Sequence, residues 1–151
     1  MPWANGCGST RLLWSDPSRE RRISVAMLER SAPFSVLPGN ARLLLVLDPI
    51  MIELTVRGCR SSLRRHDALA FAGDDPATLS LVDGPGRVLN LICRSDRWIP
   101  AVDRHGSAPI GWLAWGDSEV AKTGDMMFGD QALPCSTSLH FVQIDRTPPV
   151  G

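Results

Sequence analysis

Residues 42–56 read RLLLVLDPIMIELTV and contain the two clearest strand patterns of the chain. The uninterrupted apolar run from Leu43 to Leu47 has the length of a buried strand, and it ends at Asp48-Pro49. From Ile50 to Val56 apolar residues recur at every second position, which indicates a strand with one face on a core. Because a strong turn signal lies between the two patterns, we expect them to form a β-hairpin.

The rest of the chain continues as short strands separated by turns. Its 13 Gly and 12 Pro are spread through the 151 residues rather than gathered in one linker. Further strands are expected at 23–28, 69–72, 78–82, 88–94, 125–128 and 139–144. One short helix is expected within 111–120, and the irregular region 98–119 is expected to connect two groups of strands. About eight short strands with this spacing predict an all-β sandwich or barrel.

Charge and hydropathy exclude two classes of protein. Sixteen basic and 16 acidic side chains cancel, so the chain lacks the excess of positive charge that a general nucleic-acid binder needs. The longest apolar run is far shorter than a membrane span, and the first five residues show no signal peptide. The four Cys form no C-x-x-C pair and are expected to be reduced thiols. We therefore expect a cytoplasmic protein that binds neither nucleic acid nor membrane.

Common catalytic chemistries lack their signatures. His66, His105 and His140 are isolated from one another, so no metal site is predicted. No G-x-S-x-G motif occurs, and no cysteine lies beside a histidine that would activate it. The basic clusters 19–22 and 57–65 are expected to be solvated loops. The sequence thus predicts no metal and no other cofactor.

Polar residues inside apolar strands are the candidate binding groups. Ser24 and Asn90 each lie between two aliphatic residues, and either one needs a hydrogen-bond partner if it faces inward. An arginine such as Arg42 offers a planar fork that suits a carboxylate. Two interpretations stay open, because these groups can bind a ligand or can satisfy one another and water. The candidates are Asn5, Thr10, Arg22, Ser24, Ser35, Arg42 and Asn90.

The same residues lie in motifs that resemble the HutD/Ves family. Five motifs keep the family's order and spacing from the start of the chain to about Arg94. These motifs are PWANGCGSTR at 2–11, RISVA at 22–26, PFSVLPGNAR at 33–42, FAGD at 71–74 and LVDGPGRVLN at 81–90. The first is similar to P-W-K-N-G-G-G-x-T-R, and the third is similar to P-F-S-x-x-P-G-x-x-R.

The resemblance implies a cupin-like β-barrel of the RmlC-like jelly-roll type, commonly a compact bicupin. In a single domain spanning 1–151, the first barrel is then mainly 1–94 and a second set of strands is 95–151. The implied function is non-catalytic binding of a small carboxylated metabolite in a regulatory role, with urocanate or formylglutamate of histidine degradation as examples. A homodimer is an open option.

The resemblance also implies a ligand-binding set and a role for its members. An arginine, Arg42 or Arg22, is expected to hold the carboxylate while neighbouring polar groups orient the rest of the ligand. The family motif adds Arg11 to the candidates. The complete predicted set is Asn5, Thr10, Arg11, Arg22, Ser24, Ser35, Arg42 and Asn90.

The chain departs from the family pattern at several charged positions. Ala4 stands where lysine is usual, and Leu12, Ala41 and Val88 stand where acids are usual. Fewer acids beside surviving arginines indicate either a pocket for an anion or a pocket that has lost its function. The strand that usually precedes the P-W motif is absent, which predicts a short or wrongly assigned N-terminus.

Two alternative functions stay open. One is a metal-independent cupin enzyme, an isomerase or hydrolase, with His140 or Asp74 as its acid or base. The other is an oligomeric interaction module in which the barrel is purely structural.

Overall fold

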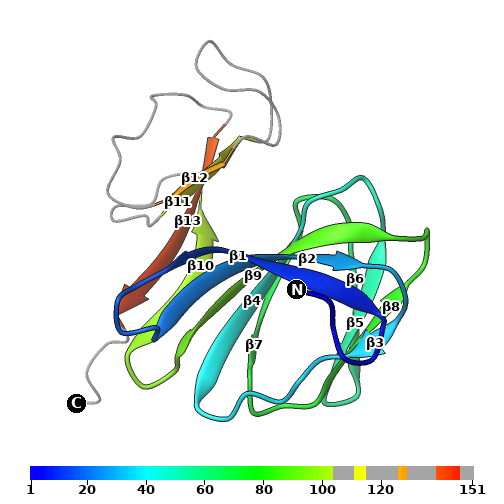
Figure 1. The fold of residues 1–151 in the computed structure, drawn as a ribbon, viewed down its shortest axis with the longest axis horizontal. Helices are drawn as coiled ribbons and strands as arrows, with labels where there is room; N and C mark the ends of the chain where they lie inside the picture. Colours follow the sequence, from blue (N-terminus) through cyan, green and yellow to red (C-terminus); the bar gives the residue numbers. More distant parts are fainter. Residues whose placement is uncertain (104–110, 115–125, 129–138, 147–151) are drawn as a thin grey trace.

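The computed structural model describes residues 1–103, 111–114, 126–128 and 139–146, and every regular element in these ranges is a β-strand (Figure 1). The all-β fold predicted from the short strand patterns is therefore confirmed. Among the described residues, none belongs to a helix with the length and apolarity needed to cross a membrane.

Residues 1–94 form a barrel from two antiparallel sheets that face each other (Figure 1). Sheet A has the order β1-β2-β9-β4-β7. Its strands are β1 (Gly8–Ser15), β2 (Arg21–Leu28), β9 (Gly86–Arg94), β4 (Asn40–Val46) and β7 (Ala68–Ala72). Sheet B has the order β3-β8-β5-β6. Its strands are β3 (Ala32–Pro33), β8 (Ala77–Leu81), β5 (Ile52–Val56) and β6 (Cys59–Leu63).

A third sheet, sheet C, has the order β10-β13-β11-β12. Its strands are β10 (Trp98–Asp103), β13 (Leu139–Arg146), β11 (Gly111–Ala114) and β12 (Met126–Phe128). The expected helix is wrong for Gly111–Ala114, where four residues are too few for periodicity to separate helix from strand. Residues 115–120 lie outside the described ranges. The division into two sets of strands at residue 94 stays a prediction.

The start of the region expected to be irregular is also a strand, β10. Its sequence WIPAVD contains Pro100, which reads as a strand breaker. Within the described sheet, β10 pairs only with β13, so it is an edge strand and the missing N–H of Pro100 interrupts no central ladder. Position at a sheet edge is a tertiary property that the local sequence does not reveal.

The hairpin predicted for residues 42–56 is wrong, because β4 and β5 belong to different sheets. β4 pairs with β7 and β9 in sheet A, whereas β5 pairs with β6 and β8 in sheet B. Asp48-Pro49 lies in the crossover between the sheets. There the Asp48 carboxylate accepts a hydrogen bond of 2.8 Å from the backbone N–H of Arg87 in β9. A turn signal shows where the chain changes direction but not which strand each segment joins.

The central strands of sheet A are buried on both faces, which explains the uninterrupted leucine run of β4. Leu44 and Val46 belong to the apolar cluster between sheets A and B. Leu43 and Leu45 belong to a second cluster on the opposite face of sheet A. Trp98 of β10 packs against that second cluster. A strand covered on both faces needs no polar alternation, so it reads as continuous apolar sequence.

The basic cluster 57–65, expected to be a loop, instead contains the edge strand β6. Arg57, Arg60, Arg64 and Arg65 are exposed. Charged side chains on an edge strand hinder pairing with other chains, so arginines occur there without a loop. In the cluster 19–22, Arg21 and Arg22 likewise begin a strand, β2.

We expect Leu44→Ala and Leu45→Ala each to lower the free energy of unfolding by about 2–5 kcal/mol, since both leave a cavity in a packed cluster. Leu12→Ala, at a side chain that is 59% exposed, should change it by less than about 0.5 kcal/mol. Urea denaturation measures all three. A negligible effect at either Leu44 or Leu45 would show that one face of β4 is open to solvent.

Candidate functional site

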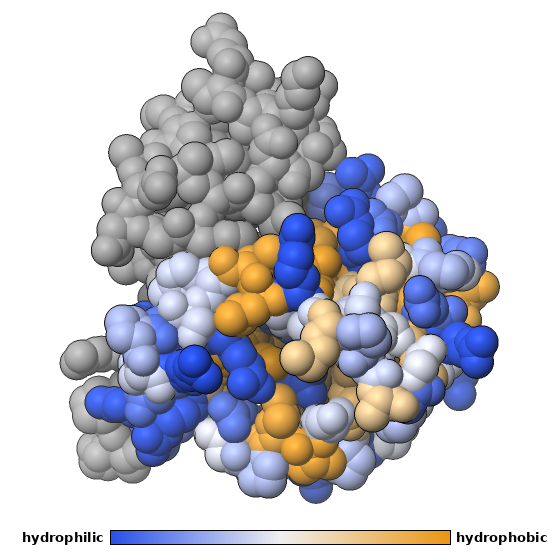
Figure 2. Space-filling view, viewed as in Figure 1, coloured by the Kyte–Doolittle hydropathy of each residue, from blue (hydrophilic) through white to orange (hydrophobic). Residues whose placement is uncertain are grey.

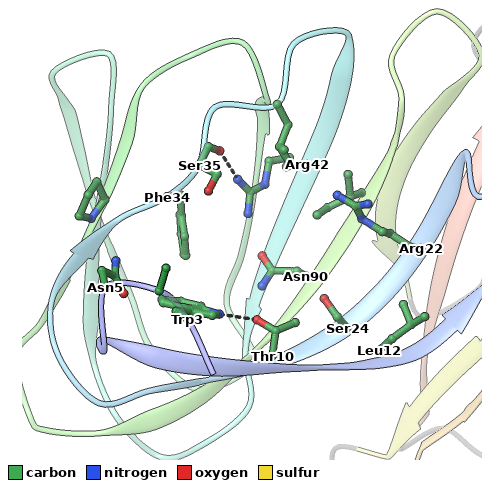
Figure 3. A pocket seen from close by; sticks show the side chains of 14 residues that line it. Trp3, Asn5, Thr10, Leu12, Arg22, Ser24, Phe34, Ser35, Arg42 and Asn90 are labelled. Atoms are coloured by element: carbon green, nitrogen blue, oxygen red, sulfur yellow. Dashed lines mark hydrogen bonds between the residues drawn. The ribbon is translucent and has the colours of Figure 1, made fainter. Parts of the chain in front are cut away.

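An open pocket of about 520 Å³ lies between the inner face of sheet A and the segment that follows β3 (Figure 3). Its lining combines a few polar groups with a larger apolar surface, a composition typical of small-molecule sites. The lining residues are Trp3, Ala4, Asn5, Thr10, Leu12, Arg22, Ser24, Pro33, Phe34, Ser35, Leu37, Arg42, Asn90 and Ile92.

The strand register of sheet A builds the floor of this pocket. Ser24 on β2 lies opposite Asn90 on β9, with Leu12 of β1 on the other side of Ser24. Two residues further along, Arg22 and Arg42 both lie opposite Ile92, on its two sides. Because residues two apart in a strand share a face, the two rows present their side chains to the same pocket.

Arg42 is a buried cation that lies over two aromatic rings. Its side chain is 6% exposed, and its guanidinium carbon lies 4.9 Å from the ring centre of Phe34 and 5.4 Å from that of Phe71. One terminal nitrogen donates a hydrogen bond of 3.1 Å to the backbone carbonyl of Ser35. The Nε atom is buried and has no partner. In the part of the chain that the structure describes, no carboxylate forms an ion pair with Arg42.

The electrostatics of the pocket are those of an uncompensated positive charge. Burial and, to a smaller extent, the nearby charge of Arg22 lower the pKa of Arg42 to about 10. A group with that pKa is still protonated at neutral pH. A buried charge without a counterion is costly, so the pocket favours an anion that approaches Arg42.

Asn90, on the same floor, carries a hydrogen-bond acceptor that no donor contacts. The residue is 5% exposed, and its side-chain oxygen Oδ1 is buried with no hydrogen-bond partner. Buried polar atoms are nearly always paired, and an exception calls for an explanation. Arg42 and Asn90 thus both line the pocket, and each carries one buried polar atom without a hydrogen-bond partner.

Trp3 and Phe34 form the apolar wall and were not among the predicted site residues. The indole Nε1 of Trp3 donates a hydrogen bond of 2.6 Å to Thr10 Oγ1 (Figure 3). The rings of Trp3 and Phe34 meet edge to face, with centroids 6.4 Å apart. The available signal was their place in the PWANGCGSTR and PFSVLPGNAR motifs, directly beside polar candidates.

All the predicted residues except Arg11 line the pocket. Arg11 follows Thr10 in β1, so its side chain points to the opposite face of the sheet and lies outside the pocket lining. Asn5 is exposed and its Oδ1 accepts a hydrogen bond of 2.9 Å from the backbone N–H of Cys7, so this oxygen shapes the turn. The backbone carbonyl of Ser35 accepts a hydrogen bond from Arg42.

The residues that depart from the family pattern have different places. Leu12 lines the pocket, where the family pattern usually has an acid, so this substitution leaves the arginines without a carboxylate at that position. Val88 is buried in the core between the sheets, and Ala41 packs against the second cluster. Only one of the three lost acids therefore concerns the pocket.

The residues suggested for an enzymatic alternative are Asp74 and His140. Asp74 lies outside its lining and accepts a hydrogen bond of 2.6 Å from the backbone N–H of Gly39. The side chain of His140 lies outside the described residues. Within the described ranges, no three His, Cys, Asp or Glu side chains group together as metal ligands.

Sheets A and B form an all-β cupin fold with an open cationic pocket. In agreement, a cupin domain of an XRE-family transcriptional regulator from Enterobacter cloacae aligns with 58% of this chain and 96% of its own, with a TM-score of 0.52 and 17% identity. The structure of HutD from Pseudomonas fluorescens SBW25 aligns with 98% of this chain and 94% of its own, with a TM-score of 0.75 and 26% identity.

Sequence comparison indicates the same family as the HutD structure. The HutD family model matches residues 1–123, and the chain belongs to the HutD family. Protein Ves of Cronobacter sakazakii is 37% identical over 100 residues, which are 63% of this chain. A 21.2 kDa protein named for the hutC 3' region of Pseudomonas putida is 35% identical over 104 residues, 65% of this chain. The matched region spans 55% of the length of each of these two relatives.

We expect Arg42→Met to raise the free energy of unfolding by about 1–3 kcal/mol, because it replaces an unpaired buried charge with an apolar chain of similar length. The exposed Arg22 is the matched control, and Arg22→Met should change stability by less than about 0.5 kcal/mol. Thermal or urea unfolding of the unliganded protein measures both. Destabilisation by Arg42→Met would mean that its contacts with Phe34, Phe71 and Ser35 outweigh the cost of burial.

Proposed function

We propose that this chain binds a small carboxylate-bearing metabolite in the pocket of sheet A. Binding does not transform the ligand, and the occupied state has a regulatory role in histidine utilisation. The observation that carries this proposal is the buried guanidinium of Arg42, which forms no ion pair with a described carboxylate and lies at the floor of an open pocket.

The chemistry of Arg42 favours a carboxylate over other anions. The guanidinium lies over the rings of Phe34 and Phe71, and its N–H groups, which lie in the guanidinium plane, are the groups that donate hydrogen bonds to a ligand. Two neighbouring N–H groups of a guanidinium can donate parallel hydrogen bonds to the two oxygens of a carboxylate. Arg22 at the exposed end of the same row adds positive charge that attracts an anion from solvent.

The remaining lining groups orient the ligand once its carboxylate is held. Asn90 Oδ1 accepts a hydrogen bond from a ligand N–H or O–H, and Ser24 lies beside it on the neighbouring strand. Trp3 and Phe34 contact the apolar part of the ligand. Thr10 acts mainly through Trp3, because Thr10 Oγ1 accepts the hydrogen bond that the indole donates.

The link to histidine utilisation comes from the family and from the Pseudomonas putida relative named for the hutC region. Urocanate and formylglutamate, both carboxylates of histidine degradation, are the first ligands to test. A regulator of a metabolic pathway acts where its metabolite is, so we also propose that the protein works in the cytoplasm.

We expect urocanate or formylglutamate to raise the thermal midpoint of the protein at millimolar concentration, because a ligand that binds only the folded state stabilises it. Arg42→Met should abolish the shift, and Arg42→Lys should weaken it because lysine lacks the planar fork. Arg11→Ala is the matched control, since Arg11 lies outside the pocket lining, and it should keep the full shift. No shift with any carboxylate of the pathway would refute the proposal.

The affinity for a carboxylate should be constant from pH 6 to pH 9 and should fall at higher pH. A carboxylate is already ionised over this range, so the titrating group is Arg42, whose pKa is about 10. Above that value the affinity should fall about tenfold per pH unit, because only the protonated guanidinium holds the anion. Calorimetric titration at several pH values measures this. A loss of affinity between pH 6 and pH 8 would assign the anchor to a histidine instead.

A further inference from the structure

The floor of the pocket is longer than a small carboxylate. From Leu12 on β1 to Arg42 on β4 the floor crosses β2 and β9, and three inter-strand spacings give about 14 Å. An extended polypeptide advances about 3.3–3.6 Å per residue, so about four residues span this distance. A metabolite the size of one amino acid that is anchored at Arg42 leaves the β1 end of the floor uncovered.

The uncovered end is apolar and accessible. Leu12, at the β1 end of the floor, is 59% exposed. The space-filling view shows hydrophobic and hydrophilic residues side by side on the described part of one face (Figure 2). Apolar side chains of a ligand long enough to reach Leu12 would remove this surface from water.

The two unfilled polar atoms fit one particular chemical group. Arg42 lies opposite Ile92, and Asn90 is two residues before Ile92 on the same face, so the two side chains begin at diagonal positions about 7–8 Å apart. A polypeptide C-terminus carries a backbone N–H one carbon away from its carboxylate. The carboxylate accepts from Arg42 while the N–H donates to Asn90 Oδ1.

We propose that the pocket also receives the free C-terminus of a partner polypeptide. About four extended residues lie across the floor, with the terminal carboxylate on Arg42 and the last peptide N–H on Asn90. Apolar side chains of this tail contact Trp3, Phe34 and Leu37. The inference rests on the proposed function, because the same arginine anchors both kinds of carboxylate. It goes further by identifying a protein partner and by using the β1 end of the floor.

The probes are three synthetic compounds titrated into the full chain by calorimetry. They are the tetrapeptide acetyl-Ala-Leu-Ala-Val with a free carboxylate, the same peptide with a C-terminal amide, and N-acetylvaline. We expect the acid to bind at least ~tenfold more tightly than N-acetylvaline, because three further residues bury apolar surface. The amide should lose at least ~tenfold, because it removes the charge that Arg42 recognises.

Substitution at the β1 end tests whether the tail occupies the whole floor. Leu12→Asp should reduce the preference for the tetrapeptide over N-acetylvaline by about fivefold, because it removes apolar contact where only the tail reaches. Arg11→Ala, on the opposite face of the same strand, should leave both affinities unchanged. Binding of N-acetylvaline also shows that each variant is folded.

The outcomes separate this inference from the proposed function. Equal affinities for the tetrapeptide and N-acetylvaline would overturn the inference and support a pocket for metabolites alone. Equal affinities for the acid and the amide would also overturn it, since the carboxylate would then play no part. If carboxylates of histidine degradation bind and the tetrapeptide does not, only this inference fails. If none of these carboxylates binds, the proposed function fails as well.

Discussion

The structure depends on the burial of both faces of sheet A. One face packs against sheet B, and the other carries a second apolar cluster with Trp98 of β10 against it. Any polar side chain on the central strands of this sheet must therefore be paired, solvated through a pocket or costly. Ser24, Arg42 and Asn90 are buried polar residues on these strands, and the pocket opens where they lie. The site is thus a local interruption of an otherwise apolar face.

Stability and binding oppose each other at Arg42. An apolar residue there would complete the core, whereas the guanidinium keeps a buried charge that no described carboxylate neutralises. Binding sites commonly hold such unsatisfied groups, because the ligand supplies the missing interaction. The aromatic rings of Phe34 and Phe71 stabilise the cation without neutralising it, so it stays available to an anion. Leu12 keeps the pocket free of an acid that would compete for it.

The apolar wall shows how chain segments far apart in sequence combine. Trp3 comes from the segment before β1, and Phe34 comes from the segment after β3. Thr10, a residue predicted to contact the ligand, also accepts the hydrogen bond that fixes the indole of Trp3. The same geometry gives the pocket one apolar side and one cationic side, which suits ligands that join a carboxylate to an apolar body.

The sequence by itself determined the class of fold and marked most of the polar residues that line the pocket. Strand periodicity indicated an all-β protein, and polar residues within apolar strands marked Ser24, Arg42 and Asn90, because burying such groups requires a reason. Tertiary structure alone decided that β4 and β5 lie in different sheets and that Pro100 lies on an edge strand. It also decided that the side chain of Arg11 lies outside the pocket, whereas that of Trp3 lines it. Local patterns record which face of a strand is buried, but pairing and proximity depend on which distant segment covers that face.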